Sequence, residues 1–105
     1  MPTFKINVDK AGNFYTKTTL KLSDPDLSKS EREDKKLKLE LLKPKDAYIK
    51  VLTLTINKKT LNYAVSTGKS VTVGPFPISG GDNQISFEGS SDKPSQVHEA
   101  EVTLA

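Results

Sequence analysis

Along most of this chain, hydrophobic and polar residues alternate with a period of two, the pattern of strands with one buried face. The alternating runs are 3–8, 14–22, 36–41, 47–57, 61–65, 71–73, 85–87 and 99–104. Turn residues separate them every 8–12 positions over much of the sequence. Seven or eight short strands at this spacing predict an all-β fold, an antiparallel β-sandwich of jelly-roll or immunoglobulin-like type. At 105 residues, the chain has the size of a single domain, 1–105.

The turn signals suggest how some strands connect. Ala11–Asn13 lies between the first two runs, which predicts an N-terminal hairpin. Further turns are expected at 57–59, 67–69 and 79–83, and a longer loop at 89–95. Gly74–Pro77 is not expected in a central strand, because neither proline can donate a ladder hydrogen bond.

The segment Ser28–Lys43 is ambiguous. Ser28 and Glu31 have capping-box spacing, which allows one helical turn near 28–35, and leucine, lysine and glutamate are good helix formers. Strict alternation over 36–41 favours a loop followed by a strand, while a helix over 28–43 is the alternative.

Within 47–57 the apolar phase shifts from Ile49 and Val51 to Leu52, Leu54 and Ile56. A β-bulge explains such a shift, as does a strand covered on both faces. The expected core consists of Phe4, Ile6, Leu20, Leu22, Leu39, Val51, Leu54, Ile56, Val65, Val73, Ile85, Phe87, Val102 and Leu104.

Composition argues against an enzyme. There is no cysteine, which excludes disulfides, thiolate metal ligands and a thiol nucleophile. The only histidine, His98, lies where the last loop enters the last strand, and we interpret it as a surface residue. Asp24–Asp26 resembles a fragment of a calcium loop but lacks the glycine and the distal glutamate. Ser79–Asp82 has two glycines but precedes a strand, whereas a P-loop needs a helix. No catalytic residue, metal or cofactor is therefore predicted.

Charge leaves three classes of binding partner open: protein, carbohydrate and nucleic acid. The net charge is +3, yet residues 47–81 hold four lysines and no acid, whereas 82–105 hold five acids against Lys93. This split favours either head-to-tail contacts between copies or pairing of the last strand with basic neighbours. The candidate binding residues are the basic rim and the two tyrosines on polar phases: Lys58, Lys59, Lys69, Tyr15 and Tyr48. Tyr63 falls on an apolar phase.

The second half of the chain also resembles a known group of sandwiches. Leu54–Lys59 and Val73–Phe87 are similar to a sequence motif of jelly-roll and galactose-binding-like modules. Gly81–Gly89, with the pattern G-x-N-x-I-x-F-x-G, resembles the C-terminal sandwich of tailed-phage distal tail and baseplate proteins. The matching residues are structural, and Lys58 stands where glycine is usual. The resemblance implies a sandwich fold and no binding residue.

These observations lead to an expected function. The first hypothesis is a non-enzymatic structural or interaction module of a larger assembly, such as a phage tail, baseplate or capsid-decoration component, with protein partners or self-assembly. The alternatives are a carbohydrate-binding module and a basic nucleic-acid-binding protein. With no apolar run of membrane-spanning length and no signal-peptide profile, we expect no membrane insertion. Synthesis in the cytoplasm is the simplest expectation, and it is compatible with incorporation into a virion or an exported assembly.

Overall fold

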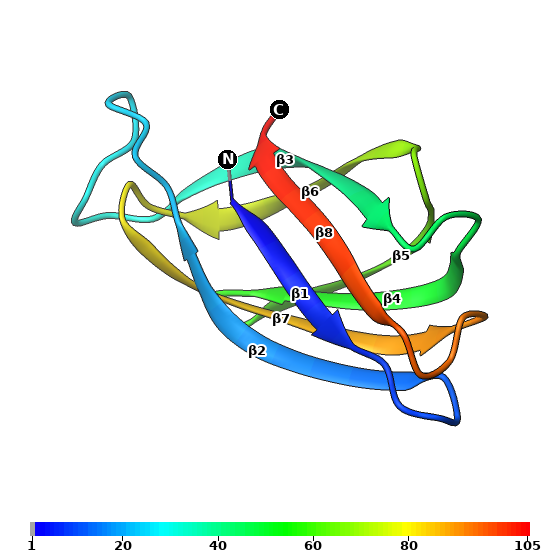
Figure 1. Cartoon of the computed structure of the whole chain (residues 1–105). Coiled ribbons are helices and arrows are strands. Elements are labelled where there is room, and N and C mark those ends of the chain that lie inside the picture. The colour runs from blue at the N-terminus through cyan, green and yellow to red at the C-terminus, as the bar shows by residue number, and fades with distance from the viewer. Residues whose placement is uncertain (1) are drawn as a thin grey trace.

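The computed structural model describes residues 2–105 and contains eight strands; Met1, the first residue of the predicted domain, lies outside the described residues. In chain order the strands are β1 (Thr3–Asn7), β2 (Asn13–Lys21), β3 (Glu33–Lys43), β4 (Tyr48–Ile56), β5 (Lys59–Ser66), β6 (Ser70–Ile78), β7 (Asp82–Ser91) and β8 (Val97–Leu104). The strands form two four-stranded antiparallel sheets that pack face to face (Figure 1). The predicted all-β sandwich is thus confirmed.

The order of strands in the sheets is that of a jelly roll. Sheet A has the order β1-β8-β3-β6 and sheet B the order β2-β7-β4-β5. Every connection except the β4–β5 hairpin carries the chain from one sheet to the other. Eight strands interleaved in this way distinguish a jelly roll from the immunoglobulin-like alternative.

The predicted N-terminal hairpin is wrong. β1 pairs with β8 in sheet A, and β2 pairs with β7 in sheet B. The turn around Gly12 exists, with the Gly12 amide donating to the Asp9 carbonyl at 3.0 Å, but it links the two sheets. Two alternating runs with a short turn look the same in sequence whether the strands pair or separate.

The ambiguous segment forms a loop and then a strand. β3 lies in the middle of sheet A, between β8 and β6. Residues 2–105 include no helix long and apolar enough to cross a bilayer. The helical turn near 28–35 is absent from the described chain; the Ser28 hydroxyl instead accepts the Glu31 amide at 3.1 Å within an irregular loop. Leu27, which the sequence pattern did not mark, is buried beside Gly80 and anchors this loop.

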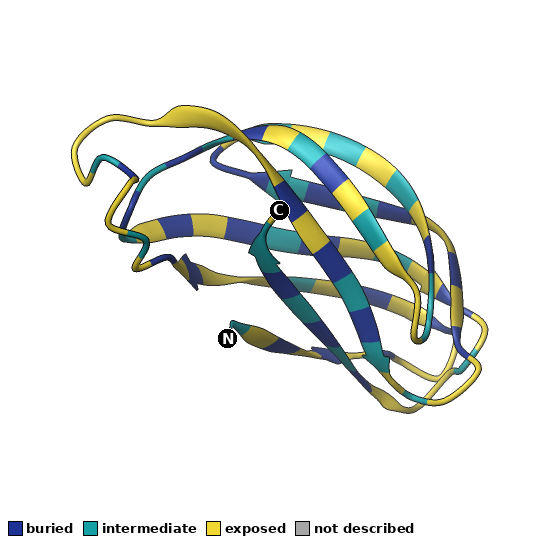
Figure 2. Ribbon diagram, turned by 90° about the horizontal axis from the view of Figure 1, so that it is seen from above, coloured by how far each residue is buried: buried dark blue, intermediate teal, exposed yellow. Residues whose placement is uncertain are grey.

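The core lies between the sheets, and buried and exposed residues alternate along the strands (Figure 2). Twelve of the fourteen predicted core residues are buried, and Leu104 is half-buried against them. Val51 is the error, with 49% of its surface exposed. The predicted bulge is present between Ile49 and Leu52, and it turns Val51 outward. The buried apolar residues that were not predicted are Val8, Phe14, Leu27, Leu37, Leu41, Ala47, Ile49, Leu52, Phe76, Ile78 and Ala100.

The proline-rich stretch and the glycine of β7 occupy positions that suit them. Gly74–Pro77 lies in β6, an edge strand that pairs only with β3, as expected. The Gly74 amide donates to the Tyr63 hydroxyl of β5 at 2.7 Å, a link between the sheet edges. The loop expected from Gly89 starts only after Ser91, because Gly89 is a paired residue of β7. A Cβ at Gly89 would lie 2.5 Å from the Val51 carbonyl oxygen.

A buried pair of asparagines joins the β4–β5 turn to the β6–β7 turn. The Asn57 side-chain amide donates to Asn83 Oδ1 at 2.8 Å and to the Pro77 carbonyl at 2.7 Å. Asn83 in turn donates to the carbonyls of Leu20, Ser79 and Gly81 and accepts the Ser79 amide. Two side chains with 6% and 1% exposure therefore connect the ends of β2, β4 and β6 to the start of β7.

Replacing Asn83 with alanine should destabilise the fold strongly. The change removes the side-chain partner of the Ser79 amide and of three backbone carbonyls, and it leaves the Asn57 amide only its bond to the Pro77 carbonyl. The free energy of unfolding should therefore fall by about 3 kcal/mol or more. Urea denaturation followed by circular dichroism measures the effect, with Asn62→Ala on the exposed side of β5 as the matched control. Equal stability of the two variants would contradict this role for Asn83.

Candidate functional site

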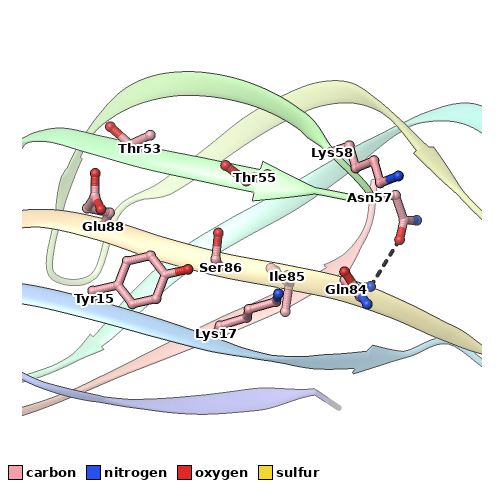
Figure 3. A pocket seen from close by; sticks show the side chains of 10 residues that line it. All are labelled: Tyr15, Lys17, Thr53, Thr55, Asn57, Lys58, Gln84, Ile85, Ser86 and Glu88. Atoms are coloured by element: carbon pink, nitrogen blue, oxygen red, sulfur yellow. Dashed lines mark hydrogen bonds between the residues drawn. The ribbon is translucent and has the colours of Figure 1, made fainter.

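The outward face of sheet B carries a hollow built from three strands and one turn. Two rows of cross-strand neighbours run over it. Lys17, Ser86 and Thr55 form one row, and Tyr15, Glu88 and Thr53 form the next. We call the hollow the sheet B groove, with a volume of about 370 Å³. It is lined by Tyr15, Lys17, Thr53, Thr55, Asn57, Lys58, Gln84, Ile85, Ser86 and Glu88 (Figure 3).

The depth of the groove follows from side-chain size. Ser86, Thr53 and Thr55 give a low, half-buried floor of hydroxyl groups in the middle of the sheet. Longer side chains rise around this floor, with Tyr15 62% exposed on the edge strand β2. Figure 3 shows Tyr15 and Glu88 toward one end, and Lys58 and Gln84 toward the other, near the β4–β5 turn.

The charges of the groove have no ion-pair partner within the described chain. Between residues 2 and 105, a single ion pair is formed, between Lys43 and Glu99 at 3.9 Å in sheet A. Lys17 and Glu88 are diagonal neighbours on β2 and β7, but they do not pair. Two cations and one carboxylate therefore face the groove without a protein partner.

Lys58 is held there by a tight turn. Asn57 and Lys58 are the two turn residues of the β4–β5 hairpin, with φ of 48° and 75°. Positive φ at both positions defines a type I′ turn, for which Asn-Gly is the favoured sequence. Two hydrogen bonds to β7 fix the turn. The backbone amide of Asn57 donates to the Gln84 carbonyl at 2.9 Å. The backbone amide of Gln84 donates to the side-chain Oδ1 of Asn57 at 3.0 Å (Figure 3).

A lysine in this conformation is strained, because its Cβ crowds the backbone where glycine has none. Strain of this kind tends to persist where a side chain serves a function. Lys58 lines the groove from this strained position.

The structure brings together two of the five predicted binding residues. Tyr15 and Lys58 both line the sheet B groove. Lys59 is half-buried at the start of β5, and Lys69 follows the end of β5, so the length of that strand, roughly 25 Å, separates Lys69 from Lys58. The three lysines therefore form no common rim. Tyr48 lies at the beginning of β4, where its amide donates to Asp92 Oδ1 at 2.8 Å.

The other residues of the groove gave a weaker signal. Lys17, Ser86, Glu88 and Thr53 are polar positions of alternating strands, like dozens of solvated positions in any sandwich. The one available clue was Lys58, which stands where the turn favours glycine.

Two shallower hollows adjoin the groove on the same face. One extends toward Asn7, Asp9 and Asn13, and the other toward Lys50 and Val51. Glu88 lines all three. The three hollows therefore meet around Glu88 of β7.

His98 is not the surface residue that was expected. It is fully buried, and its Nε2 lies 2.6 Å from the Ser91 hydroxyl. Its Nδ1 faces the Gln96 carbonyl at 3.1 Å, which can only accept, so Nδ1 carries a proton; in the neutral imidazole, Ser91 then donates to Nε2. Ser91 also accepts the Lys93 amide at 3.1 Å. The Ser91–His98 hydrogen bond thus joins the end of β7 to the start of β8 across the loop between them.

The calcium-like fragment forms a local turn. Asp24 Oδ1 accepts the Asp26 amide at 2.8 Å, and residues 2–105 contain no group of three histidine or acidic residues placed to hold a metal.

Comparison with known proteins gives a likeness of shape only. No protein-family model matches this chain, and no curated protein matches it. Among solved structures, exo-β-1,3-galactanase from Phanerochaete chrysosporium with β-1,3-galactotriose is 13% identical over the whole chain, with a TM-score of 0.45. The same enzyme with galactose is 14% identical over 97% of the chain, with a TM-score of 0.39. The chain spans 30% and 29% of the length of those proteins.

Relief of the turn strain should be measurable. Lys58→Gly should raise the free energy of unfolding by about 0.5–1 kcal/mol, because glycine adopts positive φ without a Cβ clash. Thermal and urea unfolding measure the change. The same substitution at Lys69, which has no positive φ, is the control and should be neutral or destabilising. A loss of stability in Lys58→Gly would contradict the assignment of strain.

The Ser91–His98 pair should be chemically silent. Because Ser91 is only 9% exposed and His98 is fully buried, a fluorophosphonate that labels serine hydrolases should leave the mass of the protein unchanged. Intact-mass spectrometry detects the adduct, with a serine hydrolase labelled in parallel. An adduct on Ser91 would contradict the structural role of the pair.

Proposed function

We propose that this chain is a non-catalytic carbohydrate-binding module whose ligand lies along the outer face of sheet B. The observation that carries the proposal is the sheet B groove, in which the exposed ring of Tyr15 stands beside a floor of hydroxyl groups. A sugar ring presents an apolar C–H face and a rim of hydroxyls, so an aromatic ring and short polar side chains complement it.

The groove has the donors and acceptors that such a ligand needs. Ser86, Thr53 and Gln84 each offer both roles, and Glu88 accepts from sugar hydroxyls. None of these four side chains has a hydrogen-bond partner that the fold requires: within residues 2–105, their polar side-chain atoms make no bond to the protein. They are free to bond a ligand without disturbing the sandwich.

The shape favours a chain of sugars. The two shallower hollows continue from Glu88 along the same face. An oligosaccharide of several rings can therefore contact Tyr15 near the middle of its length.

A protein partner fits this face less well. The core of a stable protein interface is apolar, whereas residues 2–105 expose four large hydrophobic residues, on three strands of the two sheets: Tyr15, Tyr48, Val51 and Val97. Nucleic acid fits less well because Tyr15 is the only aromatic residue lining the groove, whereas single-strand binders use several aromatic side chains to stack successive bases. The expected place in a phage, virion or other assembly stays a prediction and is compatible with glycan binding.

The absence of a second acid in the groove supports binding without hydrolysis. Glycoside hydrolysis generally uses two carboxyl groups on either side of the bond that is cleaved. Among the residues lining the groove, Glu88 is the only acidic one.

The central test is the loss of binding on removal of the tyrosine. Tyr15→Ala should weaken oligosaccharide binding roughly two- to tenfold, the value of one aromatic contact. Tyr48→Ala removes an exposed tyrosine outside the groove and should leave affinity unchanged. Titration of ¹⁵N-labelled protein with a panel of neutral and acidic oligosaccharides, followed by amide shifts, gives both affinity and position.

In that titration, shifts should concentrate on Tyr15, Ser86 and Glu88. Shifts elsewhere, equal effects of the two tyrosine variants, or no binding across the panel would each overturn the proposal.

A further inference from the structure

The part of the groove near the β4–β5 turn carries the positive charges of Lys17 and Lys58, which the binding of a neutral sugar does not require. We infer that the sheet B groove selects acidic glycans, with an anionic substituent between Lys17 and Lys58 and a neutral part of the sugar chain on Tyr15. This inference rests on the proposed function and specifies its ligand class.

The two lysines come from different parts of the chain to the same end of the groove. Lys17 lies on β2 opposite Ser86, two residue pairs before Thr19 and Gln84. Lys58 follows Asn57, whose side chain bonds the Gln84 amide on β7. Both lysines therefore flank the Ser86–Gln84 end of the groove, as Figure 3 shows.

Their charges are available to a ligand. Lys17 and Lys58 are exposed, and neither has an ion-pair partner among residues 2–105. Glu88 lies on the Thr53 side, and its carboxylate is directed away from Lys17 in Figure 3. An anionic group on a sugar would thus meet two cations at one end and would avoid the carboxylate at the other.

The strain at Lys58 supports a role for its charge. A type I′ turn with asparagine first is most stable with glycine second. The Asn57 position follows this rule, while Lys58 breaks it and sends a cation into the groove. A turn that only faces solvent would gain no stability from lysine in place of glycine at this position.

The polarity of the two ends also sets a direction for the ligand. Tyr15 and Glu88 form one row of neighbours, Lys17 lies in the next row beside Ser86, and Lys58 lies beyond it at the β4–β5 turn, so a hydroxyl-rich neutral ring and an acidic ring occupy different places (Figure 3). Chains in which acidic and neutral or acidic and N-acetylated rings alternate match this arrangement.

The test compares acidic oligosaccharides with neutral counterparts of the same backbone. Oligogalacturonate, oligomannuronate and hyaluronan hexasaccharides are each titrated beside the carboxyl-reduced form, in which the acid becomes a hydroxymethyl group. A sulfated dextran oligosaccharide beside unsulfated dextran separates sulfate from carboxylate as the anion. At low salt, at least one acidic form should bind roughly tenfold more tightly than its neutral form, the combined contribution of two exposed charge pairs. The preference should shrink at 0.5 M salt, since screening weakens exposed pairs.

Variants identify the residues. Lys58→Asn keeps positive φ accessible while removing the charge, and Lys17→Thr keeps strand propensity. Each should lower affinity for the acidic form roughly three- to fivefold and lower affinity for the neutral form by a smaller factor, so that the ratio of the two affinities falls. Lys69→Met removes one positive charge at the other end of β5 and should change neither affinity.

The outcomes separate this inference from the function on which it rests. Equal binding of acidic and neutral forms, or an equal effect of Lys69→Met and Lys58→Asn, overturns the acidic preference and leaves the carbohydrate site in place. No binding of any form overturns both.

Discussion

The bonded side chains of Asn57 and Asn83 are the constraint on which the corner of this sandwich depends. The chain passes from sheet A to sheet B between β6 and β7, and two residues into β7 Asn83 bonds both the crossing loop and the β2 carbonyl of Leu20. Asn57 adds the neighbouring hairpin turn. Buried amides are costly when unpaired, so a network in which both are bonded admits one register of these strands and disfavours others.

The candidate site is a consequence of that register. Lys58 follows Asn57 and Gln84 follows Asn83, so the amides that fix the corner also place the basic end of the groove. The hydrogen-bonded Asn57 tolerates positive φ, and the rigid turn forces the same sign of φ on the next residue. The strain at Lys58 is thereby held by a buried network instead of relaxing into a different turn.

The sequence predicted strands well because alternation is a local signal. It offered a bulge as one explanation of the phase shift before Leu52, kept Gly74–Pro77 out of a central strand, and named about half of the buried apolar residues. It failed where the answer is non-local. The pairing of β1 depends on β8, almost a hundred residues away. The burial of His98 depends on its hydrogen bond with the Ser91 hydroxyl, at the other end of the β7–β8 loop. Of the groove, only Tyr15 and Lys58 were predicted, since its floor is made of ordinary serine and threonine residues that become neighbours through β2, β7 and β4.

Interleaving also explains why charge along the chain does not become charge on opposite sides of the molecule. The acid-rich stretch 82–105 is divided between β7 in sheet B and β8 in sheet A. In sheet A, Glu99 meets Lys5 across the strands and Lys43 at 3.9 Å, so part of the acidity is neutralised within the fold. In sheet B, Glu88 is the only acidic residue that lines the groove, which Lys17 and Lys58 also line. The separation of charge that matters for recognition is therefore the one along the groove, produced by the jelly-roll topology from residues that the sequence keeps far apart.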